Sequence, residues 1–198
     1  MRTFKIGVCA LAFVACAAVP RPAVACGMDG GGLIGLAVQR AYISWLYPET
    51  RKLHGSIQAA KSAGRLDAIE EKASGPLAFH RTSAELTQFA RTLVGDTPAP
   101  LGVTILYQGP MLWTNVTSTE KGAKVTVHAA AQASGTVLLV TERPVVRALV
   151  SGRISGVDAV ELGLVTLHAP AGQVDMLKAA IHSKFPGSDT QVSELAGE

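Results

Sequence analysis

Residues 101–141 read LGVTILYQGPMLWTNVTSTEKGAKVTVHAAAQASGTVLLVT. Runs rich in β-branched and aromatic residues alternate with turn residues such as Gly109-Pro110, and this pattern predicts β-strands. Links this short favour antiparallel pairing of successive strands. The third strand alternates apolar and polar residues, which predicts one solvated face, whereas the fourth is apolar on both faces and is expected at the centre of the sheet. The four predicted strands span residues 101–108, 111–117, 124–130 and 135–141.

Helical patterns lie on both sides of this stretch. Apolar residues recur at helical spacing before the Pro-rich boundary at Thr97-Pro98-Ala99-Pro100, and they predict helices over 33–46, 50–63, 66–73 and 77–93. After Pro144 the sequence predicts a helix, a second helix capped by Ser155, a fifth strand over 164–167 and a last helix over 171–184.

This order of elements predicts an α+β fold, because helices and strands are segregated along the chain. The expected architecture is a set of N-terminal helices, an antiparallel sheet of four to five strands, and a C-terminal helix-helix-strand-helix unit. Residues 26–97 form the predicted helical region and 98–187 the α+β region, and the two are expected to share one domain. Residues 188–198 are expected to be a flexible tail.

The C-terminal unit carries a family resemblance. The strand Val137-Leu138-Leu139-Val140-Thr141 is followed by a helix ending at Ser151-Gly152-Arg153, then by a helix containing Ala159, then by Gly163-Leu164. Over residues 136–185 this succession resembles the C-terminal half of the sterol carrier protein 2 (SCP2) family. The resemblance implies an apolar cavity between sheet and helices that holds a lipid-like molecule, and it implies no catalytic residue.

The first 25 residues are typical of a bacterial export signal. Arg2 and Lys5 precede an apolar run over 6–19, which is shorter than a membrane span, and Ala23-Val24-Ala25 is a cleavage signal of small residues. Cleavage before Cys26 predicts a periplasmic or secreted protein. Acylation of Cys16 or Cys26, which would make a lipoprotein, is the alternative.

Removing this segment changes the charge balance. Three of the 18 Lys and Arg residues lie in residues 1–25 and none of the 15 acidic residues does, so residues 26–198 hold 15 of each. A nucleic-acid binder needs surplus positive charge to neutralise phosphates, and no such partner is predicted. No further segment of the sequence is predicted to cross a membrane. Only Cys26 of the three Cys residues remains after cleavage, which leaves no internal disulfide.

The candidate site residues are aromatic and apolar. Ligand pockets are mostly hydrophobic and aromatic, so one interpretation places five such side chains around an apolar pocket, although the simpler interpretation places them in the core. Cys26 and Met28 are weak candidates for a soft metal, and His128 and His168 lie on predicted strands that could bring them together. No cofactor is predicted. The five pocket candidates are Trp45, Tyr47, Tyr107, Met111 and Trp113.

These observations predict an exported binding or accessory protein that holds a hydrophobic ligand in an apolar cavity. One alternative is an accessory subunit that acts through protein contacts in an envelope complex. A second alternative is a metal or redox protein that uses Cys26 and Met28. An enzyme ranks below these because the sequence has no catalytic signature such as a Gly-x-Ser-x-Gly elbow.

Overall fold

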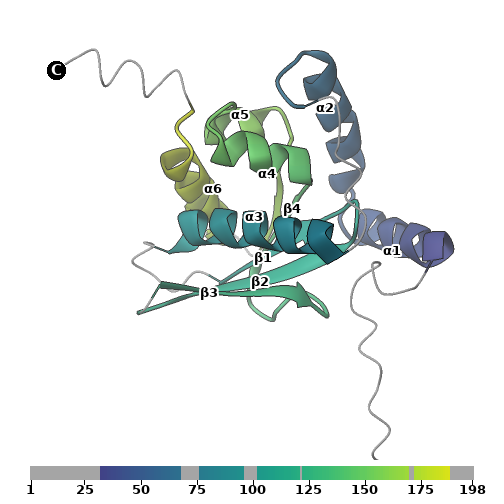
Figure 1. Ribbon diagram of the computed structural model, residues 1–198, viewed down its shortest axis with the longest axis horizontal. Helices are drawn as coiled ribbons and strands as arrows, with labels where there is room; N and C mark the ends of the chain where they lie inside the picture. Colours follow the sequence, from purple (N-terminus) through teal and green to yellow (C-terminus); the bar gives the residue numbers. More distant parts are fainter. Residues whose placement is uncertain (1–31, 68–75, 96–101, 121, 170–171, 188–198) are drawn as a thin grey trace, which may run out of the picture.

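The computed structural model describes residues 32–67, 76–95, 102–120, 122–169 and 172–187. The predicted export signal, Cys26, Met28, the boundary at 97–100, most of the helix predicted over 66–73 and the predicted tail lie outside these residues. Figure 1 shows the described elements in space. They are α1 (Gly32–Leu46), α2 (Thr50–Ser62), α3 (Pro76–Val94), β1 (Gly102–Tyr107), β2 (Leu112–Thr119), β3 (Gly122–Ala129), β4 (Val137–Thr141), α4 (Arg143–Val150), α5 (Gly156–Glu161), β5 (Thr166–His168) and α6 (Gln173–Lys184).

The five strands form one sheet in the order β3-β2-β1-β4-β5. The pairs β1–β2, β2–β3 and β4–β5 are antiparallel, and β1–β4 is parallel. The predicted α+β class is therefore confirmed, with a sheet that is mostly antiparallel. The expectation that β4 pairs with its predecessor β3 is wrong, because β4 lies on the far side of β1. It is an interior strand, and all five of its residues are buried as their apolar character predicts.

A seven-residue segment explains this difference. Residue Ala129 at the end of β3 is in register with Trp113, at one end of the sheet, whereas Val137 at the start of β4 pairs with Val103 at the other end. The segment 130–136, called the crossing segment below, therefore runs back along the length of the sheet. Seven extended residues reach roughly 23 Å, which is enough to pass a five-residue strand. A parallel partner needs such a return connection, and a tight hairpin cannot supply it.

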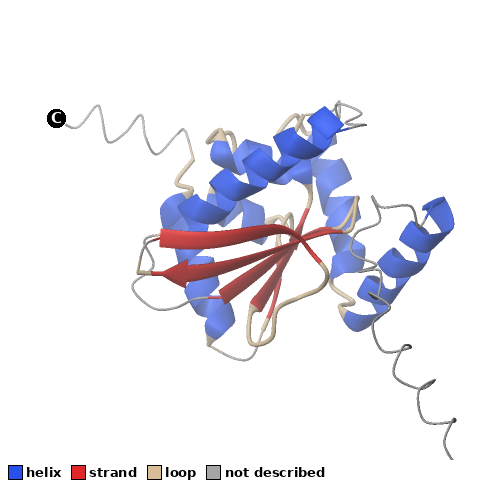
Figure 2. Ribbon diagram, turned by 60° about the horizontal axis from the view of Figure 1, so that its bottom comes forward, coloured by secondary structure: helices blue, strands red, loops and turns tan. Residues whose placement is uncertain are grey.

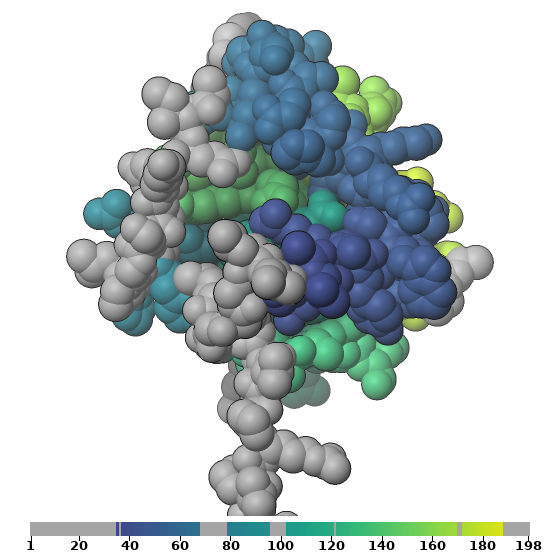
Figure 3. All heavy atoms as spheres, turned by 90° about the vertical axis from the view of Figure 1, so that its right-hand side faces the viewer, coloured from purple at the N-terminus to yellow at the C-terminus, as the bar shows by residue number. Residues whose placement is uncertain are grey.

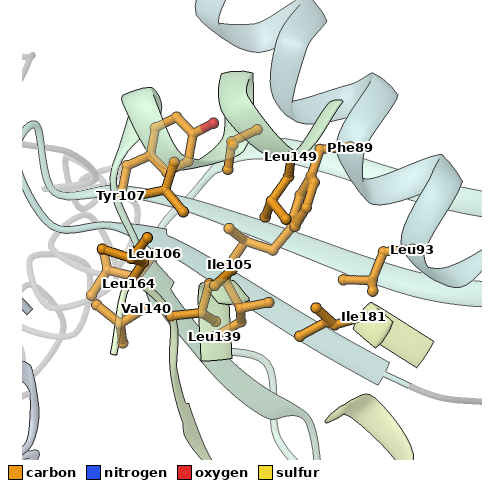
Figure 4. Packing of buried hydrophobic residues seen from close by; sticks show 14 of the residues in the cluster. Phe89, Leu93, Ile105, Leu106, Tyr107, Leu139, Val140, Leu149, Leu164 and Ile181 are labelled. Atoms are coloured by element: carbon orange, nitrogen blue, oxygen red, sulfur yellow. The ribbon is translucent and has the colours of Figure 1, made fainter. Parts of the chain in front are cut away.

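The two faces of the sheet have different coverings. Figure 2 shows the strands side by side, with helices packed on the sheet. On one face Phe89 of α3 and Leu149 of α4 pack over Ile105 and Leu139, and Ile181 of α6 completes the layer, as Figure 4 shows. All of these side chains are at most 2% exposed. On the second face the crossing segment contacts Thr104 through the Thr136 hydroxyl and the Ala133 amide.

Within the C-terminal unit, α5 begins where the sequence predicts it. Ser155 caps α5, and its hydroxyl accepts a hydrogen bond from the Asp158 amide at 3.0 Å. The next residue, Gly156, lies so close to α6 that an added Cβ would stand 2.2 Å from the carbonyl oxygen of Ile181. Only glycine allows this approach, which fixes α5 against α6. No helix among the described residues is both long and apolar enough to cross a bilayer.

Candidate functional site

The structure spreads the five predicted pocket residues over separate places. Tyr107 is fully buried in β1 and shares its side of the sheet with Ile105, beneath the helices. Trp113 pairs with Leu106, so it lies on the second face. Tyr47 also lies over the second face, where its hydroxyl donates to Gln132 of the crossing segment at 3.2 Å.

The two remaining candidates differ sharply in burial. Met111 is 2% exposed in the turn before β2, with a positive φ of 54°. Trp45 on α1 is 66% exposed, so its simpler interpretation as a core residue is wrong. Buried apolar side chains from the sheet and from α3, α4 and α6 pack against one another in the layer between them, as Figure 4 shows. The five candidates therefore do not converge on one place, and the apolar pocket stays a prediction.

The histidine pair also separates. His128 lies on β3 and His168 on β5, which are opposite edges of the sheet. His128 makes an edge contact with Phe79 of α3, whereas His168 packs against Tyr47 with ring centroids 4.6 Å apart. Among the described residues no group of three His, Cys, Asp or Glu side chains could hold a metal ion. Cys26 and Met28 fall outside those residues.

A different set of residues does converge, in a cleft between α1, α2 and the two chain turns beside them. We call it the α1–α2 cleft. Its volume is about 470 Å³. Figure 3 shows the face of the molecule on which α1 and α2 lie next to each other. The lining residues are Arg40, Ser44, Thr50, Arg51, His54, Ile57, Gln58, Lys61, Gln108, Gly109 and Glu142.

Two adjacent stripes on α2 explain why this helix contributes most of the lining. Residues at positions 50, 53, 57 and 60 are buried and attach the helix to the core. The positions one residue later, 51, 54, 58 and 61, carry Arg, His, Gln and Lys and follow the same spacing. The helix that is held by its apolar stripe thus presents a neighbouring polar, basic stripe to the cleft.

The other walls are held by specific contacts. The guanidinium of Arg40 donates to the carbonyl oxygen of Gly109 in the β1–β2 turn, which joins α1 to the sheet. A Cβ on Gly109 would lie 2.8 Å from a carboxylate oxygen of Glu142, so glycine there lets Glu142 reach the cleft. Arg51 Nε donates to the carbonyl oxygen of Ser44 at 3.1 Å, which joins α2 to α1.

The cleft has an excess of positive charge. Arg40, Arg51 and Lys61 face a single carboxylate, Glu142, and His54 adds an imidazole. Residues 26–198 hold equal numbers of basic and acidic residues, so this is a local concentration rather than a property of the whole surface. An oriented group of cations with N–H donors is suited to bind a carboxylate, sulfate or phosphate.

Sequence reasoning missed this site for two reasons. The i, i+3, i+7, i+10 spacing of the basic stripe on α2 is visible in the sequence and could have been found. Gly109 and Glu142, however, are more than 45 residues beyond α2, and only the fold brings them beside it.

The buried Tyr107 is chemically unusual but lies apart from the cleft lining. Its hydroxyl has no hydrogen-bond partner among the described residues. Burial, above all, raises the pKa of this hydroxyl well above its usual value, and the nearby carboxylate of Glu85 raises it further. Arg143 beside it forms two hydrogen bonds of 2.8 Å with Glu85, which join α4 to α3. Tyr107 therefore stays protonated and acts as a core residue.

Comparisons with known proteins give only distant similarities. No protein-family model and no curated protein matches the chain. Among solved structures, a stereoselective inverting sec-alkylsulfatase from a Pseudomonas species has a TM-score of 0.36 at 10% sequence identity. The match covers 46% of this chain and 14% of the sulfatase. A double mutant of a sec-alkyl sulfatase has the same TM-score and the same coverage at 11% identity. A conserved hypothetical protein from Thermus thermophilus, described as possibly a sterol carrier protein, has a TM-score of 0.29 at 12% identity, over 55% of this chain and 84% of that one.

This chain thus spans about a seventh of the sulfatase's length. The weak SCP2-like resemblance of the sequence is matched by a weak structural one.

Proposed function

We propose that this protein is an exported binding protein of the bacterial envelope, and that its ligand is a small amphipathic anion. The α1–α2 cleft receives the negatively charged group of that ligand. The observation that carries this proposal is the gathering of three cations and an imidazole around 470 Å³, opposite one carboxylate. Export rests on the features of residues 1–25, with periplasmic or secreted localisation following from them.

The physical support comes from how the cations are held. Arg40 and Arg51 each donate to a backbone carbonyl oxygen, which restricts their side chains before a ligand binds. Because of this, ligand binding has a smaller cost in side-chain entropy. Each guanidinium has further N–H donors, because it carries five. The buried Ile57 supplies an apolar floor for the uncharged part of the ligand.

This proposal changes the expected ligand from a purely hydrophobic molecule to one with a charged group. Buried core residues such as Phe89 and Ile105 lie in the layer where the SCP2-like resemblance implies a cavity, and the apolar cavity stays a prediction. The two other roles, a protein-contact subunit of an envelope complex and a metal or redox protein using Cys26 and Met28, stay predictions.

Calorimetric titration with three probes tests the proposal. Decanoate and decyl phosphate carry the charged group, and decyl maltoside has the same alkyl chain without charge. We expect the two anions to bind and the maltoside to bind far more weakly. Added salt should weaken anion binding, because exposed charge interactions are screened over about 10 Å at 0.1 M.

A matched pair of variants locates the site. Arg51→Gln removes a cation of the cleft, whereas Lys52→Gln removes a cation of the same helix that does not line it. A hydrogen bond to a charged group contributes about 1.5–3 kcal/mol, so Arg51→Gln should weaken anion binding by roughly tenfold to a hundredfold. Lys61→Gln checks the result without altering the contact between Arg51 and Ser44. Equal binding by Arg51→Gln, Lys61→Gln and Lys52→Gln would refute the assignment, as would equal binding of the uncharged probe.

A further inference from the structure

The outer side of α1 carries an exposed apolar stripe made of Val38, Tyr42, Trp45 and Leu46, called the α1 stripe below. These side chains are 63%, 58%, 66% and 41% exposed. They occupy positions i, i+4, i+7 and i+8, so at about 100° per residue they share an arc of roughly 100°. Four of the seven large exposed hydrophobic residues in the described part of the chain lie in this one stripe, so it is a concentrated patch rather than scattered exposure.

The rest of α1 is already engaged. Ile43 is buried in the core, and Arg40 and Ser44 line the α1–α2 cleft on the side of the helix opposite the stripe. The helix therefore has one side fixed to the protein and the other free. In Figure 1, α1 lies at the right-hand edge of the molecule, beyond the end of α3. None of the described elements covers the stripe.

The chemistry of the stripe favours a lipid surface. Tyr42 and Trp45 combine apolar rings with polar groups, and their rings lie 6.2 Å apart. Such residues are enriched where a membrane meets water. Helix α1 contains no acidic residue, and its one charged residue is Arg40. Nothing on the helix therefore repels an anionic lipid headgroup.

The position of the helix in the chain gives a second argument. Helix α1 begins six residues after Cys26 and thirteen after the apolar run 6–19. Six residues reach at most about 20 Å. During export, and permanently if Cys26 is acylated, α1 is therefore held within reach of the membrane surface. No comparable observation supports a second copy of the chain, or another protein, as the partner that covers the α1 stripe.

We propose that the α1 stripe lies in the interfacial layer of a phospholipid membrane and holds the protein at the membrane surface. Amphipathic helices of this kind insert their apolar side roughly 5–10 Å into the boundary between headgroups and acyl chains. The contact is mainly apolar and needs no surplus of positive charge, in agreement with the neutral balance of residues 26–198. A result that refutes membrane binding would not affect the proposed anion site, because the α1 stripe and the α1–α2 cleft are on opposite sides of α1.

Vesicle flotation with the chain from Gly27 onward tests the proposal. This form lacks the apolar run and Cys26, which could bind lipid on their own, and it retains every residue of the buried core. The vesicles contain phosphatidylethanolamine and phosphatidylglycerol. In a Trp113→Phe background Trp45 is the only tryptophan, so its emission reports the stripe directly. We expect flotation and a shift of the emission to shorter wavelength.

The variant Val38→Ser with Tyr42→Ser should lower the partition coefficient at least tenfold. The control, Val157→Ser with Leu162→Ser, changes two apolar residues of similar character that are 40% and 38% exposed elsewhere, and it should leave partitioning unchanged. Circular dichroism confirms that both remain folded. Absent flotation, or equal loss in both pairs, would overturn the proposal. Sedimentation equilibrium tests the other occupant, a second copy of the chain. If the protein does not bind vesicles but forms a dimer, and Val38→Ser with Tyr42→Ser abolishes that dimer, the stripe is assigned to the second copy instead.

Discussion

The hydroxyl of Thr104 offers a direct test of how the crossing segment fixes the parallel strand pair. Thr104 is fully buried on β1, on the second face of the sheet. Its hydroxyl donates to Asn115 Oδ1 at 2.7 Å, lies 2.7 Å from the Thr136 hydroxyl and accepts from the Ala133 amide at 3.3 Å. It thus joins β1, β2 and the segment that leads into β4. Thr104→Val keeps the shape of the side chain and removes these bonds.

The expected cost follows from which partners remain satisfied. Without the hydroxyl, the Ala133 amide still reaches Asn115 Oδ1 at 3.3 Å, and the Thr136 hydroxyl still donates to the Ala133 carbonyl at 2.7 Å. No buried group is left without a partner, so the loss is that of the bond to Asn115 Oδ1 at 2.7 Å and the bond from the Ala133 amide at 3.3 Å, at about 0.5–1.5 kcal/mol each. We therefore expect the free energy of unfolding to fall by about 1–3 kcal/mol. In a chain of this size that lowers Tm by roughly 2–12 °C.

Urea unfolding followed by circular dichroism measures the change, with Thr126→Val as the control. Thr126 on β3 pairs with Asn115 on β2 but is exposed, so its variant should stay within about 0.5 kcal/mol of the wild type. Amide exchange at Ala133 should also accelerate in Thr104→Val. A Thr104→Val protein as stable as the wild type, or a control that loses as much, would refute the proposed role of this network.

Two further predictions concern the buried Tyr107 and the partly buried His168. The variant Tyr107→Phe removes a buried hydroxyl that has no hydrogen-bond partner among the described residues. The free energy of unfolding, measured by urea unfolding, should stay unchanged or rise by up to about 1 kcal/mol. A clear decrease would show that the hydroxyl makes a hydrogen bond. Burial lowers the pKa of His168 below its usual 6.5, while Glu49 opposes the shift. As the pH is lowered, His168 is therefore protonated at a higher pH in the unfolded chain than in the folded one. The free energy of unfolding should fall as the pH drops below about 6.5, and it should level off below the pKa of His168 in the folded protein. His168→Gln should flatten this part of the profile, and Glu49→Gln should extend the loss to lower pH; an unchanged profile in His168→Gln would contradict the assignment.

The elements could be predicted because their signals are local. Apolar periodicity over a dozen residues predicted α1 and α6 to within two residues at each end, and the hydroxyl of Ser155 identified the start of α5. The fifth strand was displaced by up to two residues, since three residues carry too little pattern to fix its ends. The α1–α2 cleft was harder to predict, because its lining residues are divided between α2 and two turns that are distant in the sequence.

By itself the sequence determined the α+β class, the type and order of the helices and strands that the structure describes, the solvated side of β3 and the balanced charge of residues 26–198. Each depends on side chains a few residues apart, whose spacing is preserved on folding. The tertiary structure alone decided that β4 pairs with β1, that Trp45 is exposed, and that Gly109 and Glu142 meet the basic stripe of α2. Those outcomes depend on which surfaces pack together across the whole chain. The first of them is supported by hydrogen bonds between the crossing segment and Thr104, which no local pattern encodes.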